Sequence, residues 1–259
     1  MSLPVAFLWG LLAALGLMTL VWLAAMRRRD ASLVDRFWGI GFIVVGVLWW
    51  GMAGFPAAGL WMLVPVVLWG LRLSAYITWR NWGHGEDARY TAMRGELTDA
   101  AFARRSLVTI FGLQGALVAA IGLPVLAGVS AQSVQPLLLA AGLAVWAFGF
   151  VFETVADLQM ARFRADPQRR GEVMDRGLWR YSRHPNYFGE IVVWVGYGLL
   201  ALAAGGWWGI PSAVLMIVLI LRVSGVTLLE SHLHETRPGY AEYVARTPAL
   251  IPRRPRRRA

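Results

Sequence analysis

The sequence predicts an all-α, polytopic membrane protein with seven transmembrane helices, an outside N-terminus and a cytoplasmic C-terminus. Composition is the first observation: 58% of residues are hydrophobic and only 15% are charged, whereas soluble proteins carry about a quarter charged residues. The second is that the apolar residues form long uncharged runs, and about 20 consecutive apolar residues let one helix cross a bilayer. The third is the placement of arginine, which predicts the orientation.

The uncharged runs predict the spans in chain order. Residues 3–26 form the first span, which three arginines close. The next run, residues 37–71, is too long for one helix. It breaks at Gly54-Phe55-Pro56, because glycine and proline interrupt helices, and the third span then continues to about Trp79. The run at residues 107–152 is weakest at 128–136 and therefore predicts spans four and five.

Two further spans are predicted at residues 187–204 and 207–229, around a turn at Gly205-Gly206. The polar segments after spans one, three, five and seven hold nearly all the arginines. The turns near Phe55, Val129 and Gly206 hold none. By the positive-inside rule, the arginine-bearing ends face the cytosol.

Missing residue types exclude several kinds of chemistry. The chain has no cysteine, so disulfides, iron–sulfur clusters and thiolate nucleophiles are excluded. It also has no lysine, which excludes Schiff-base catalysis. The net charge of +10 is therefore carried by arginine alone. We attribute this charge to topology and to the anionic lipid bilayer rather than to a nucleic-acid partner.

Charged residues inside the predicted spans indicate a functional site, because each costs about 2.5–3.5 kcal/mol on insertion scales. Glu153, Asp157 and Arg164 occupy positions i, i+4 and i+11, so they share one helix face. Asn186 and Glu190 are four residues apart on the next span. Two adjacent spans thus each carry a polar stripe at the cytoplasmic end. The stripes form either a polar helix–helix contact or a ligand site.

The arginine-rich segment between the stripes favours a dinucleotide ligand. Guanidinium groups bind phosphate bidentately, and the carboxylates and amide could hold ribose hydroxyls and a carboxamide. Aromatic rings in and beside the segment could stack on the bases. The candidate residues that this adds are Arg162, Arg183, Trp179, Tyr181 and Tyr187.

No metal site is predicted near the C-terminus. His232 and His234 are only two residues apart on a predicted helix, so their side chains face different directions. An interfacial or nucleotide-facing role suits His232 better. The chain also lacks the G-x-G-x-x-G pattern of a Rossmann domain, so a bound nucleotide would not use that fold.

The stretch from Gly177 to Glu190, GLWRYSRHPNYFGE, resembles the signature of the steroid 5α-reductase C-terminal domain family, and most closely its bacterial branch of membrane proteins. Other motifs of that branch recur along nearly the whole chain: Asp35 with Trp38-Gly39, Leu71-Arg72-Leu73, Glu86-Asp87-Ala88-Arg89-Tyr90, and Arg237-Pro238-Gly239-Tyr240 with Tyr243. A similar Arg-His-Pro-x-Tyr motif occurs in isoprenylcysteine carboxyl methyltransferases, which bind S-adenosylmethionine. That activity is the alternative.

The resemblance implies an NADPH-dependent reductase of a conjugated enone in a steroid-like lipid. Residues 1–128, with spans one to four, would form the apolar substrate pocket, and residues 129–259 the cofactor region. Glu153 stands where the family carries asparagine. The resemblance places the following residues at the cofactor: Asp157, Arg164, Asn186, Glu190, Trp179, Arg183, His184, Tyr187, Tyr240 and Tyr243. We expect a monomer in a bacterial inner membrane, with its active site open to the cytosol.

The substrate carbonyl would be bound by an acid pair. Family enzymes use a carboxylate on span two and a tyrosine on span three. Asp35 matches the carboxylate, but the tyrosine position falls on Trp69. Either Tyr76 or Tyr90 would replace it, or the substrate differs from that of the family enzymes. As hydride reaches the β-carbon, negative charge grows on the carbonyl oxygen, and a hydrogen-bond donor in a dry pocket stabilises that charge.

Overall fold

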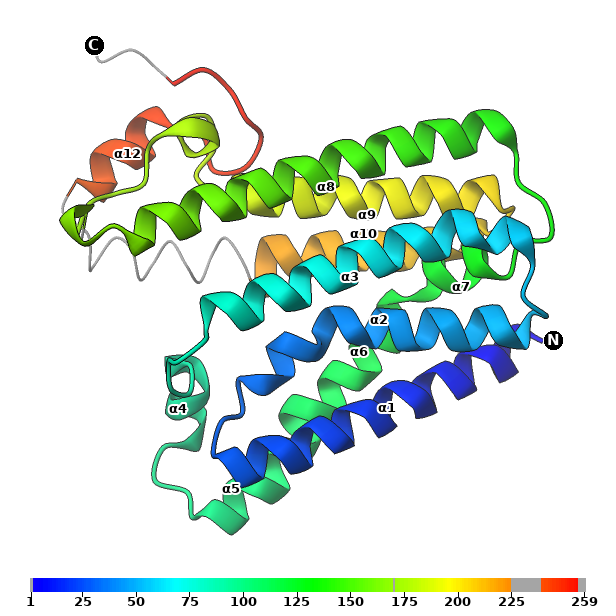
Figure 1. Ribbon diagram of the computed structural model, residues 1–259, viewed down its shortest axis with the longest axis horizontal. Coiled ribbons are helices and arrows are strands. Elements are labelled where there is room, and N and C mark those ends of the chain that lie inside the picture. The colour runs from blue at the N-terminus through cyan, green and yellow to red at the C-terminus, as the bar shows by residue number, and fades with distance from the viewer. Residues whose placement is uncertain (1, 170, 225–238, 256–259) are drawn as a thin grey trace. The chain divides into compact units, whose positions relative to one another are not determined.

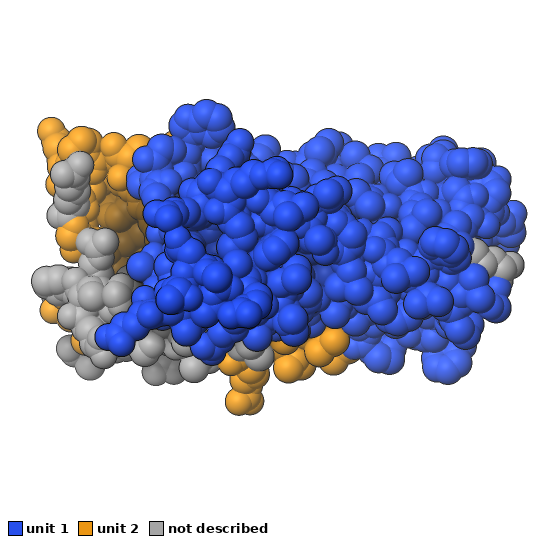
Figure 2. Space-filling model, turned by 90° about the horizontal axis from the view of Figure 1, so that it is seen from below, with its two compact units in different colours: residues 1–139, 200–212 blue, residues 140–199, 213–259 orange. Residues whose placement is uncertain are grey.

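The computed structural model describes residues 2–169, 171–224 and 239–255, and these residues form helices and turns without any strand. Six of the helices are long and apolar enough to cross a membrane. The all-α prediction is confirmed, and the protein is an integral membrane protein. The chain folds as two compact units, coloured separately in Figure 2. Unit 1 comprises residues 1–139 and 200–212, and unit 2 comprises residues 140–199 and 213–259.

The first three predicted spans are consecutive long helices of unit 1 (Figure 1). The chain reverses between the second and third at the predicted break, where Gly54 has φ 84° and Phe55 has φ 57°. Such left-handed residues end helices. The elements are α1 (Leu3–Arg28), α2 (Leu33–Met52), the 3-10 turn η1 (Ala57–Gly59) and α3 (Leu60–Arg80).

Helices α2 and α3 touch backbone to backbone at a pair of glycines. A Cβ atom on Gly39 would lie 2.4 Å from the carbonyl oxygen of Gly70, and one on Gly70 would lie 2.6 Å from that of Gly39. Small residues allow this close approach between helices in a membrane. The contact also fixes the first turn of α2, which carries Asp35 one helical turn before Gly39.

The fourth predicted span is a broken helix that begins before residue 107. It starts at Asp99 because the Thr98 side chain accepts a hydrogen bond from the Ala101 N–H and caps the helix. It breaks at Gly122, just before Pro124, which has no N–H to donate to a preceding turn. Its parts are α5 (Asp99–Ser106), the π-helix η2 (Leu107–Gly112), α6 (Leu113–Ile121) and α7 (Leu123–Val129).

The fifth and sixth spans are two long helices, and shorter elements surround them. The predicted turn is present at Gly205, which has φ 76°. The apolar stretch after it is described from Trp207 to Arg222 as a shorter helix. The predicted seventh span continues to residue 229, outside the described residues, so seven spans and the orientation stay predictions. The elements are α4 (Ala88–Arg94), α8 (Pro136–Ala165), η3 (Pro167–Arg169), η4 (Gly177–Arg180), α9 (Pro185–Ala203), η5 (Trp207–Gly209), α10 (Ile210–Leu219), η6 (Ile220–Ser224) and α12 (Tyr240–Arg246).

Candidate functional site

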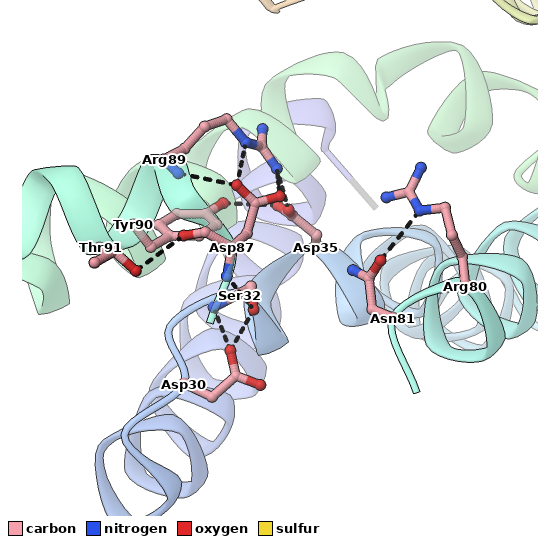
Figure 3. Close-up of polar contacts among 9 residues, drawn as sticks. All are labelled: Asp30, Ser32, Asp35, Arg80, Asn81, Asp87, Arg89, Tyr90 and Thr91. Carbon is pink, nitrogen blue, oxygen red and sulfur yellow. Dashed lines mark hydrogen bonds and ion pairs between the residues drawn. The ribbon is translucent and has the colours of Figure 1, made fainter. Parts of the chain in front are cut away.

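Asp35, on the first turn of α2, is the centre of a polar cluster in unit 1 (Figure 3). The Tyr90 hydroxyl donates to one carboxylate oxygen of Asp35 at 2.7 Å, and the Arg89 guanidinium donates to the other at 2.8 Å. Tyr90 is 5% exposed, whereas the Arg89 side chain is 59% exposed. The cluster thus has a buried phenol on one side and an accessible guanidinium on the other.

The segment before α4 is held against the start of α2 by backbone hydrogen bonds as well. The Glu86 carboxylate accepts from the Ala31 N–H at 2.8 Å, and the Ser32 hydroxyl accepts from the Asp87 N–H at 3.4 Å. Asp87 in turn accepts from the backbone and guanidinium of Arg89. These contacts, rather than the helix itself, bring Tyr90 to Asp35.

The other candidate tyrosine, Tyr76, lies on α3 between two guanidinium groups. The carbon atoms Cζ of Arg72 and Arg80 lie 6.0 and 5.6 Å from its ring centroid. Tyr90, by contrast, donates its hydroxyl hydrogen directly to Asp35 (Figure 3). Of the two alternatives, the geometry therefore favours Tyr90.

The surroundings of the cluster shift the pKa values of Tyr90 and Asp87. Burial, and then the charge of Asp35, raise the pKa of Tyr90 above its ordinary value. The hydrogen bond from Arg89 lowers the pKa of Asp87, although burial opposes it. Tyr90 has one hydroxyl hydrogen, and it is donated to Asp35. A substrate oxygen would therefore compete with Asp35 for the one hydroxyl hydrogen of Tyr90.

Asp87 gives a prediction about pH. Asp87→Asn removes the charge but keeps a side chain that can cap α4. Since the folded-state pKa lies below the ordinary value of 3.8, the carboxylate stabilises the fold above that value and loses this effect as pH falls through the folded pKa. We expect a wild-type advantage of less than about 1 kcal/mol at neutral pH, vanishing in acid. Thermal unfolding of both proteins at a series of acidic pH values tests it, and a pH-independent difference contradicts it.

In unit 2, α8 and α9 are packed so closely that their glycines have no room for a methyl group. A Cβ atom on Gly189 would lie 2.5 Å from the backbone nitrogen of Glu153, and one on Gly149 would lie 2.6 Å from that of Val193. The helices are antiparallel, and three contacts set their register: Gly196 against Trp146, Gly149 against Val193, and Gly189 against Glu153.

If this register continues for one more helical turn, the predicted polar residues Asp157 and Asn186 lie at about the same height along the two helices. Asp157 follows Glu153 by four residues, and Asn186 precedes Gly189 by three, so each lies on the face that carries the contact. Glu153 is 3% exposed and Asp157 is 6% exposed. The carboxamide oxygen of Asn186 is buried and finds no hydrogen-bond donor among the described residues.

The loop that precedes α9 is held by α12 and by the segment after it. The Arg183 guanidinium donates to the carbonyl oxygens of Val244 and Thr247, at the end of α12. Its backbone N–H donates to Pro248, and that of His184 to Ala249. These bonds form a clamp, defined as residues 240–253, which positions the start of α9.

Two predicted cofactor residues also make hydrogen bonds that hold this loop. The Trp179 indole N–H donates to the carbonyl oxygen of Ala156 at 3.0 Å. The Tyr243 hydroxyl hydrogen bonds to the carbonyl oxygen of Trp179 and lies 3.2 Å from that of Ser182. Burial raises the pKa of Tyr243, so this donor keeps its proton. Both side chains are buried, at 6% and 3% exposed.

The other predicted cofactor residues differ in exposure. His184 is buried and its ring stacks on Tyr187 at 5.6 Å, and Tyr240 is 3% exposed. Tyr187 and Glu190 are half-buried on the opening turns of α9. His232 lies outside the described residues. Three residues face solvent or headgroups: Arg162, Arg164 and Tyr181.

Sequence reasoning missed Arg89 as a member of the Asp35 cluster, although the segment that contains it was singled out. The signal was the run of acid, base and phenol at Asp87, Arg89 and Tyr90, which caps and opens the short helix α4. A second missed residue is Tyr197, which is 1% exposed and packs edge-on against Trp194 at 5.3 Å. It follows Glu190 by seven residues and so extends the α9 stripe.

These features define a helical integral membrane protein with two buried carboxylates and a buried amide oxygen on a glycine-packed helix pair. The chain belongs to the family described as "Protein of unknown function (DUF1295)", whose model matches residues 21–247. A stretch of 66 residues is 32% identical to 3-oxo-5-alpha-steroid 4-dehydrogenase 1 of Bos taurus. That match spans 26% of this chain and 26% of the bovine protein. No solved structure matches the chain.

Proposed function

We propose that the protein is a membrane-embedded, NADPH-dependent reductase that transfers hydride to the conjugated enone of a steroid-like lipid. The proposal is supported by the local identity to a 3-oxo-5-alpha-steroid 4-dehydrogenase. It rests above all on one observation, the buried oxygen of Asn186 on a helix pair whose glycine register brings it to the level of the buried Asp157 and Glu153. A buried acceptor without a donor costs about 1–3 kcal/mol. A hydroxyl or amide of a nucleotide would supply the donor.

The donor set of unit 2 fits a phosphorylated dinucleotide. Glu153 and Asp157 would accept from ribose hydroxyls, and Asn186 and Glu190 from hydroxyl or carboxamide groups. The exposed guanidinium groups of Arg162 and Arg164 would bind the phosphates. The remaining aromatic and imidazole groups would line the bases: Tyr181, Tyr187, His184, His232 and Tyr240. Trp179, Arg183 and Tyr243 would act by holding the loop in place.

When bound, NADPH supplies the hydride that the β-carbon of the enone accepts. The chain's own contribution is the hydrogen-bond donor at the carbonyl oxygen, which we assign to Tyr90 with Asp35 and Arg89. The α-carbon then gains one proton from solution, so one hydride and one proton saturate the double bond. An acid group placed in this way contributes about 10²–10⁴-fold to a rate.

The proposal also includes the orientation of the protein in the membrane and the routes of cofactor and substrate to the site. The arginine-bearing ends face the cytosol, where NADPH is available, and the lipid substrate enters from the bilayer. The protein acts as a monomer in a bacterial inner membrane, without nucleic acid.

Ligand-dependent stability of the purified chain tests the cofactor. A ligand at 100 times its dissociation constant stabilises a protein by about 2.7 kcal/mol. We expect NADPH to raise the unfolding midpoint, NADH to do so less, and S-adenosylmethionine not at all. Asp157→Asn should reduce the NADPH shift, whereas Glu172→Gln, which removes an exposed carboxylate of the same unit, should not. A shift with S-adenosylmethionine alone would favour the methyltransferase, and equal loss in both variants would contradict the site.

A further inference from the structure

A small cavity lies where α1, α4 and α5 meet in unit 1. It has a volume of about 240 Å³ and is lined by Met26, Arg29, Arg94, Asp99, Ala100 and Ala103. The lining comprises two guanidinium groups, one carboxylate and three apolar side chains. We propose that this cavity binds the phosphodiester headgroup of an anionic phospholipid, a site separate from the proposed reductase chemistry.

Arg94 is pre-organised for an anion. Its Nε and one terminal nitrogen donate to Glu86 at 3.2 and 2.9 Å, and its guanidinium carbon lies 4.0 Å from the centroid of the Phe102 ring. The remaining nitrogen is turned toward Asp99, 3.7 Å away, which is beyond hydrogen-bond distance. Because the side chain is only 20% exposed and held on two sides, it offers a fixed donor to the cavity.

Asp99 occupies the place that a phosphate would take. Its carboxylate bonds Arg29 at 2.7 Å and faces Arg94 from the other side. Both members of the Arg29–Asp99 pair are exposed, at 77% and 63%. An exposed ion pair contributes little to stability, so an incoming phosphate can displace the carboxylate from both guanidinium groups without disturbing the fold. A phosphodiester can bind a guanidinium group in the same bidentate geometry as a carboxylate.

An apolar track leads from the cavity, which favours a lipid over a free phosphate. Leu20 and Leu23 are 66% and 39% exposed, and along Leu20, Leu23 and Met26 each residue is the helical neighbour of the next, three positions on. The Trp22 indole donates to the carbonyl oxygen of Ala103 at 3.1 Å and so ties α1 to α5 beside the cavity. A headgroup in the cavity can therefore lay its acyl chain along α1, and basic pockets between spans are known to suit anionic headgroups.

Paired variants distinguish a site from general attraction to charge. The full chain is reconstituted in nanodiscs of phosphatidylcholine with increasing phosphatidylglycerol, and bound phosphatidylglycerol is counted by native mass spectrometry. Arg29→Gln should weaken retention about tenfold, the effect of losing one charge-assisted contact. Arg28→Gln removes the same charge one residue away and outside the lining, and it should retain the lipid.

Two further variants distinguish a loss of the lipid site from misfolding of the protein. Arg29→Gly relaxes a left-handed residue, φ 52°, so it should lose the lipid while its unfolding midpoint in phosphatidylcholine is maintained. Asp99→Asn removes the competing carboxylate and should tighten retention severalfold. Glycerol 3-phosphate, added in solution at the same concentration as the phosphatidylglycerol, should not displace the bound lipid. Equal retention by Arg28→Gln and Arg29→Gln, or weaker retention by Asp99→Asn, would overturn the proposal.

Discussion

Gly189→Ala is expected to separate α8 from α9 and to remove NADPH binding. The new Cβ atom would lie 2.5 Å from the backbone nitrogen of Glu153, an atom that cannot move aside alone. The helices must therefore part, which costs about 1–3 kcal/mol. The separation also moves Asn186, one turn earlier on α9, away from Asp157. We expect at least a tenfold loss of NADPH affinity, or about 1.4 kcal/mol.

The measurements are the unfolding midpoint without ligand and its shift with NADPH. Gly16→Ala is the matched control, because nothing lies within 4 Å of a Cβ atom at Gly16, and alanine is the better helix former. It should leave both quantities unchanged or raise the midpoint slightly. A Gly189→Ala protein with wild-type stability and NADPH affinity would mean that the helices do not pack in this register.

Asp35→Asn is expected to abolish turnover while NADPH binding survives. An amide accepts hydrogen bonds less well than a carboxylate, so both the Tyr90 and Arg89 contacts weaken. If the pair acts as the acid group at the carbonyl oxygen, the rate should fall by about 10²–10⁴-fold. Tyr90→Phe should cause a comparable loss, because it removes the donor itself.

Steady-state oxidation of NADPH with an enone substrate, together with the NADPH-induced midpoint shift, measures both properties. Tyr76→Phe separates the two tyrosines that the sequence left open, and it should keep most of the activity. A large loss in Tyr76→Phe with full activity in Tyr90→Phe would reverse the assignment. Loss of the NADPH shift in Asp35→Asn would contradict the division between substrate and cofactor residues.

The spans were predictable because their signals are local. Uncharged runs need only a count of apolar residues, and the chain reversal at Gly54 and Phe55 follows from residue type. The polar stripe on α8 was also predictable, because Glu153 and Asp157 are four residues apart and therefore share a helical face. The fourth span began earlier than predicted because capping by Thr98 extends it into a polar segment.

Contacts between distant residues were not predictable in the same way. Asp35 meets Tyr90 across 55 residues, and nothing in the spacing distinguishes Tyr90 from Tyr76. The choice depends on the backbone bonds of Glu86 and Asp87, which only the folded loop reveals. Composition likewise predicts that Arg183 binds phosphate, whereas the structure places its guanidinium at the end of α12.

The clamp at residues 240–253 can form only late in the synthesis of the chain. Its hydrogen bonds reach back to residues 182 and 183 from positions 64 to 68 residues further along the chain. A ribosome makes those positions only after it has made the whole of α9 (Pro185–Ala203). The loop before α9 therefore gains these hydrogen bonds late, after both of the helices that it joins have been made.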